Sequence, residues 1–169
     1  MVIPKLYYHY IEKIIPPELV YQIICFKDNL ETSIINDDLN SFHILVTDYK
    51  TRNNLQQYEL SHLISVYNSV KILKYIVKHN LNINYNPRNL FTCVRYKRYK
   101  ICKIFLQRFD YDPNVFNSMA IVPLFLSLKS NDLKMSKILL NNGADLDIQL
   151  GTGYYILQQL IRLDILVYI

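Results

Sequence analysis

Residues 122–147 have the sequence VPLFLSLKSNDLKMSKILLNNGADLD, and this stretch decides the fold. Weaker copies of it cover residues 37–46, 68–84 and 99–106. We expect a second helix in each copy, and the first apolar residues of these four helices are Leu39, Val70, Tyr99 and Leu133. They are 31, 29 and 34 positions apart. A period of about 33 residues predicts a repeat protein, whose units must stack because none can bury its apolar face alone.

The same stretch resembles an ankyrin repeat. Pro123 and Leu124 occupy the start of the family pattern, Lys137–Leu140 its second helix, and Gly143–Asp147 its closing G-A-D-L-D. The resemblance implies an all-α, ankyrin-type helical solenoid of about four to five helix-turn-helix repeats with an N-terminal helical cap. It divides the chain into a cap at residues 1–27 and a repeat domain at residues 28–169, whose last repeat is incomplete.

Ankyrin repeats usually place glycine where the first helix ends, because the chain enters the left-handed region there. The equivalent positions here hold, in chain order, Asp37, Asn68, Lys97 and Asn131. Because Asp and Asn tolerate that conformation best among non-glycine residues, we expect left-handed turns at these positions. After the second helix, two units have Gly143 and Asn80, and we expect rebuilt turns where the others have Phe109 and Asp48.

The composition fits one soluble helical domain. Hydrophobic residues make up 51% of the chain, which is enough for a core, and no apolar run approaches the roughly 18–20 residues of a membrane span. Met1–Lys13 lacks the pattern of a signal peptide, and the three cysteines lack metal-ligand spacing. Cytoplasmic localisation is therefore expected, with Cys93 and Cys102 as buried thiols. The Ile-, Asn-, Lys- and Tyr-rich composition, together with degraded repeats, resembles proteins of poxviruses and giant DNA viruses, which implies host cytosol.

The N-terminal segment has two interpretations. Solenoid ends need an element that covers the first exposed core face, so a helical cap is the favoured one. The alternative is that residues 15–24 resemble the opening of an F-box, which docks a substrate adaptor onto a cullin-type ubiquitin ligase. On that alternative the docking residues would be Pro17, Glu18, Leu19 and Ile23.

Residues 95–108 are rich in Arg and Lys, in a chain of net charge +5. Basic residues interleaved with aromatics can bind phosphates and stack bases. In the repeat register, however, Arg95–Lys100 covers the end of one helix, a turn and the start of the next, so a solvated turn is favoured over nucleic-acid binding. An acidic protein partner would use the same residues.

Catalysis and metal binding have little support in the sequence. None of the four histidines neighbours Cys, Asp or Glu at ligand spacing, and His62 occupies the position of the structural His of the ankyrin pattern. Gly151 and Gly153 lack the Lys-Ser/Thr of a phosphate loop and are expected in a hairpin before a helix. No cofactor, metal or catalytic residue is predicted, and we expect a protein that is not an enzyme.

The expected function is a non-catalytic protein–protein interaction module that engages a host protein and no membrane. Ankyrin proteins bind through the face formed by hairpin tips and exposed residues of the first helices. Mapped onto this chain, the candidate partner-binding residues are Tyr85, Arg88, Arg95, Tyr96, Phe116, Met119 and Lys129.

The C-terminus predicts a fifth first helix at Tyr155–Leu163, with Leu157, Leu160 and Ile161 on its apolar face. Only Ile165–Ile169 remain for a second helix, and all five of these residues are apolar. Either this tail folds back as a short cap, or it leaves apolar surface exposed that favours self-association.

Overall fold

The computed structural model describes residues 28–47, 59–84 and 86–162, and this part of the chain is all-helical. Its helices come in pairs: residues 28–35 with α3 (Leu39–Thr47), α5 (Leu60–Tyr67) with α6 (Val70–Lys78), α7 (Asn89–Arg95) with α8 (Tyr99–Arg108), and α9 (Pro123–Lys129) with α10 (Leu133–Leu140). A last helix, α11 (Ile156–Arg162), follows a hairpin whose ends meet in an isolated bridge between Gln149 and Tyr155. The second helices begin at the four predicted residues.

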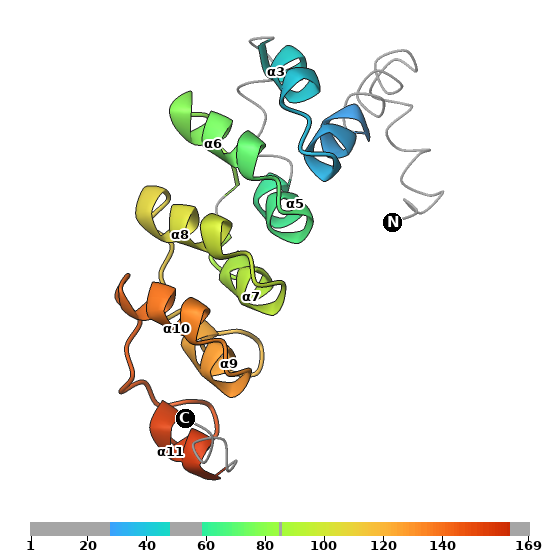
Figure 1. Ribbon diagram of the computed structural model, residues 1–169. Helices are drawn as coiled ribbons and strands as arrows, with labels where there is room; N and C mark the ends of the chain where they lie inside the picture. Colours follow the sequence, from blue (N-terminus) through green and yellow to red (C-terminus); the bar gives the residue numbers. More distant parts are fainter. Residues whose placement is uncertain (1–27, 48–58, 85, 163–169) are drawn as a thin grey trace, which may run out of the picture.

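The pairs stack in a row (Figure 1). The first helix of each pair packs against the first helix of the next, in the order α5, α7, α9 and α11. The second helices do the same in the order α3, α6, α8 and α10, on the other side of the row. One continuous apolar core lies between the two layers, and its largest fully buried side chains include Phe42, Ile76 and Phe105. No helix in the described ranges has the length and apolar character to cross a lipid bilayer.

The turn inside each pair is left-handed, as predicted. The φ angles are 49° at Asp37, 63° at Asn68, 54° at Lys97 and 52° at Asn131. Each left-handed residue reverses the chain within a few residues, so that the second helix runs back along the first. The residue four positions before each of these left-handed residues is buried, and the four are Ser33, Ile64, Cys93 and Ser127.

The closing turn after α8 is rebuilt, as predicted. Asn80 and Gly143 have φ angles of 50° and 91°, but the residue with positive φ after α8 is Asp110, at 51°, and not Phe109. The reason is the length of α8, which has 10 residues where α6 has 9 and α10 has 8. Phe109 instead ends the helix with its ring 6.0 Å from that of Phe105.

Polar contacts join consecutive pairs at equivalent positions. The backbone N–H groups of Lys71 and Ile72, at the start of α6, donate to the Asp37 carboxylate at 3.1 Å. Ser69, the residue just before α6, also contacts the preceding pair, because its hydroxyl donates to the Ile34 carbonyl. These bonds satisfy free groups at helix ends and set the register between neighbours.

The helix α11 lies where the sequence predicts the first helix of a fifth pair, but the face that it buries differs from the predicted apolar face. Ile156 and Leu160 are buried, whereas Leu157 and Ile161 are exposed. The two buried residues are four positions apart and therefore share one side of the helix, which packs on α9. The predicted cap at residues 1–27, Asp48 and the apolar tail at Ile165–Ile169 lie outside the described residues.

Candidate functional site

A hollow of about 720 Å³ opens on the side of the first helices, and we call it the first-helix hollow. Four of the seven predicted contact residues line it: Arg88, Arg95, Tyr96 and Met119. They come from the start and end of α7 and from the loop before α9, and neighbouring lining residues come from α5 and α9. The stacking of three consecutive pairs therefore creates this concave surface.

Two guanidinium groups hold Tyr96 at the rim of the first-helix hollow. The Cζ atoms of Arg95 and Arg98 lie 5.9 and 5.7 Å from the centre of its ring, within the range of cation–π attraction. Arg98 is itself fixed, because its Nη2 donates to the Val66 carbonyl at 2.7 Å and its Nε to the Ser65 carbonyl at 3.4 Å. One of the two groups beside the exposed Tyr96 ring, Arg98, is thus anchored to α5.

Met119 reaches the hollow from a loop that is ordered by one side chain. The Asn117 Oδ1 accepts hydrogen bonds from the N–H groups of Met119 and Ile121, at 2.9 and 3.0 Å. Met119 is 68% exposed. Phe116 and Lys129 are also exposed, but they do not line the hollow.

The remaining predicted site residues cannot be placed in the same way. Tyr85 and the F-box-like residues lie outside the described part of the chain, the latter being Pro17, Glu18, Leu19 and Ile23.

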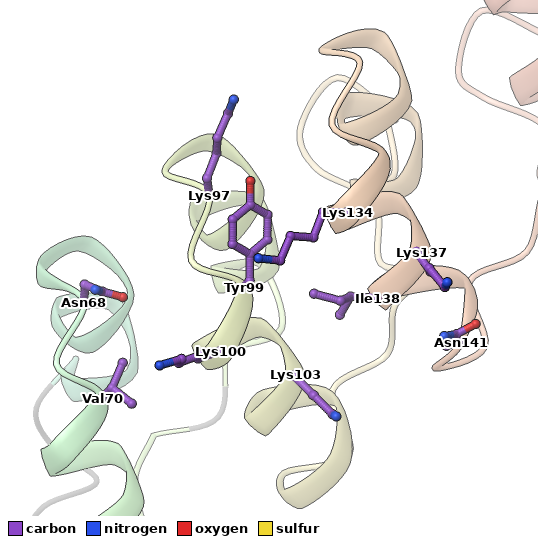
Figure 2. Close-up of a pocket in the computed structure, with 10 residues that line it drawn as sticks. All are labelled: Asn68, Val70, Lys97, Tyr99, Lys100, Lys103, Lys134, Lys137, Ile138 and Asn141. Carbon is purple, nitrogen blue, oxygen red and sulfur yellow. The ribbon is translucent and has the colours of Figure 1, made fainter. Parts of the chain in front are cut away.

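A second hollow of about 670 Å³ lies on the other side of the row, between α6, α8 and α10, and we call it the lysine groove (Figure 2). Five lysines line it, with no Asp or Glu among the lining residues; they are Lys97, Lys100, Lys103, Lys134 and Lys137. Val70 and Ile138 add apolar surface, and Figure 2 shows Ile138 between α8 and α10. Lys97 lines both hollows, because it occupies the turn between α7 and α8.

Tyr99 forms part of the lysine groove and is already engaged on both its ring and its hydroxyl. The Lys134 Nζ lies 4.4 Å from the centre of the ring. The hydroxyl donates to the Asp132 carboxylate, 3.1 Å from Oδ2. Partial burial and this carboxylate both raise the pKa of Tyr99 above its ordinary value.

Among the described residues, no group of three His, Cys, Asp or Glu side chains is placed to hold a metal ion. Cys93 and Cys102 are buried, and burial raises the pKa of the Cys93 thiol well above its usual range, with a further contribution from Cys102. His62 Nδ1 lies 3.3 Å from Asn89 Oδ1 on the next first helix, which is a contact between pairs.

Comparison with known proteins adds no further assignment: no family model matches the chain, and no curated protein matches it.

The basic run, for which the sequence favours a solvated turn, supplies three of the five lysines of the lysine groove. The predicted basic run covers Lys97, Lys100 and Lys103 but not Lys134 or Lys137, which are more than 30 residues away from Lys100. The missed signal is the position within the repeat, because Lys100 and Lys134 are both the second residue of their helices. The register set by Tyr99 and Leu133 already places the two lysine pairs at equivalent positions, so the signal is present in the sequence.

Proposed function

We propose that this protein is a non-catalytic protein–protein interaction module built from ankyrin-type repeats, which binds a protein partner through the first-helix hollow. The observation that carries the proposal is the meeting of Arg88, Arg95, Tyr96 and Met119 around one hollow. The repeat register independently predicts these residues as contacts, from their places at hairpin tips and on exposed parts of the first helices. The ankyrin assignment rests on the residue pattern and is supported by the stacked pairs and their left-handed turns.

The chemistry of the first-helix hollow suits a protein surface. Tyr, Arg and Met are enriched in interface cores, and truncation of buried aromatic and Arg anchors costs the most binding energy. Tyr96 combines an exposed ring with restrained neighbours, so less conformational entropy is lost when a partner covers it. The resemblance to proteins of large DNA viruses makes a cytosolic host protein the proposed partner.

The test compares proteins recovered from cell lysate by three forms of the full chain. The first form is the native sequence, and the second combines Tyr96→Ala with Met119→Ala. The third is the matched control Tyr67→Ala. Tyr67 has the same 45% exposure as Tyr96 and also lies at the end of a first helix, but it does not line the hollow. Quantitative mass spectrometry then ranks each recovered protein across the three forms.

A partner that is retained by the native chain and by Tyr67→Ala, but lost from the double variant, supports the proposal. Equal recovery by all three forms would refute a role for the hollow. Recovery of cullin-ligase subunits that depends on residues 1–27, and not on Tyr96, would favour the adaptor function instead.

A further inference from the structure

Three consecutive second helices carry lysine at their second and fifth positions. All six side chains are exposed, and we call them the lysine ladder: Lys71, Lys74, Lys100, Lys103, Lys134 and Lys137. The last four line the lysine groove, and the first two extend the same register onto α6. Because equivalent positions of stacked pairs face the same way, the ladder forms two parallel rows across three helices.

This arrangement carries an energetic cost in the free protein. Residues three apart on a helix are neighbours, and like charges at that spacing repel. The lining of the groove contains no Asp or Glu. Lys71, at the α6 end of the ladder, interacts with the Asp38 carboxylate, and its backbone N–H donates to the Asp37 carboxylate. The Asp132 carboxylate next to Tyr99 is buried and accepts hydrogen bonds from the Tyr99 hydroxyl and the Met135 N–H. A concave surface with charge of one sign attracts ligands of the opposite sign.

We propose that the lysine ladder binds an extended acidic segment of a partner protein, laid across α6, α8 and α10. Packed helices have axes about 8–10 Å apart, and a segment in the polyproline II conformation advances about 3.1 Å per residue with three residues per turn. An acidic residue at every third position therefore lies on one face of such a segment and meets one helix after another. This surface lies on the opposite layer from the first-helix hollow and does not depend on the function proposed for it.

The groove favours a protein segment over a nucleic acid. Binding of single strands relies on aromatic rings on which bases stack. The one aromatic side chain in the groove, Tyr99, has Lys134 over its ring and its hydroxyl committed to Asp132. Val70 and Ile138 are half-buried and apolar, which suits aliphatic side chains between the acidic residues of a peptide.

The experiment measures fluorescence anisotropy of labelled probes titrated with the full chain. The first probe is a peptide of about twelve residues with glutamate at every third position, and the second has the same composition with its glutamates clustered. A single-stranded thymidine oligonucleotide of equal charge is the third. The ladder variant is Lys100→Gln with Lys134→Gln, and the charge-matched control is Arg108→Gln with Lys129→Gln, whose residues are exposed and outside the groove.

We expect the spaced peptide to bind more tightly than the clustered one, and its Kd to rise about tenfold in the ladder variant. The charge-matched control should change that Kd less than about twofold, with unchanged circular dichroism in both variants. Equal weakening by both variants, or equal affinity for both peptides, would overturn the proposal in favour of unspecific attraction. Tighter binding of the oligonucleotide, lost in the ladder variant, would overturn it in favour of nucleic acid.

Discussion

Replacing Asp132 with alanine should destabilise the protein through two separate contacts. Asp132 precedes α10, and its Oδ1 accepts the backbone N–H of Met135 at 3.0 Å, which caps the helix. Its Oδ2 accepts the hydroxyl of Tyr99, from the preceding pair, at 3.1 Å. Loss of an N-cap costs about 1 kcal/mol. Loss of a hydrogen bond to a charged group costs about 1.5 kcal/mol more. The sum predicts a loss of about 2–3 kcal/mol in the free energy of unfolding.

A double-mutant cycle with Tyr99→Phe separates the two contacts, because that change removes the hydroxyl and keeps the ring near Lys134. Urea unfolding followed by circular dichroism gives the free energies of the native chain, Asp132→Ala, Tyr99→Phe and the double variant. We expect a coupling energy of about 1 kcal/mol between the two positions. Additive effects, with a coupling below about 0.3 kcal/mol, would refute the view that this bond holds α8 and α10 together.

Three further predictions concern the core, a close contact and a thiol. Leu139→Ala should cost about 2–5 kcal/mol in urea unfolding because Leu139 is fully buried, while the exposed Lys137→Ala should change stability little. Gly151→Ala should lower the Tm, because a Cβ at Gly151 would lie 2.4 Å from that of Ala120, whereas a normal Tm would mean that the hairpin shifts freely. The pKa of Cys93 is raised in the folded protein above its value of about 8.5 in the unfolded chain, so the free energy of unfolding should fall as pH rises above about 8.5. Unfolding titrations across alkaline pH should show a smaller fall for Cys93→Ala.

The sequence predicts those features of the fold that follow from the repeat period and from the backbone preferences of single residues. The four turn residues from Asp37 to Asn131 were found because Asp and Asn mark left-handed turns, and the register then placed Lys97 among them. An apolar pattern does not show where the last helical hydrogen bond forms, so the sequence predicts a rebuilt turn after α8 but not the extra residue of that helix. It places Leu157, Leu160 and Ile161 on one apolar face, whereas packing on α9 buries Leu160 and leaves Leu157 and Ile161 exposed.

The two hollows also differ in how far the sequence alone predicts their residues. Arg95 and Tyr96 adjoin in sequence and could be recognised together, whereas Lys134 joins Lys100 only because two helix pairs stack in register. Such a surface is a property of the superposed units and not of any one segment.

The left-handed conformation of Lys97 lowers the stability of the fold, while the charge of the same residue contributes to both hollows. A side chain without the local hydrogen bonding of Asn or Asp costs on the order of 1 kcal/mol in this conformation. Asparagine at this position would relieve the backbone, as it does at Asn68 and Asn131, but would remove the one positive charge that lines both hollows. The most stable version of this chain and the version best able to attract acidic ligands are therefore different sequences, and they diverge at this turn.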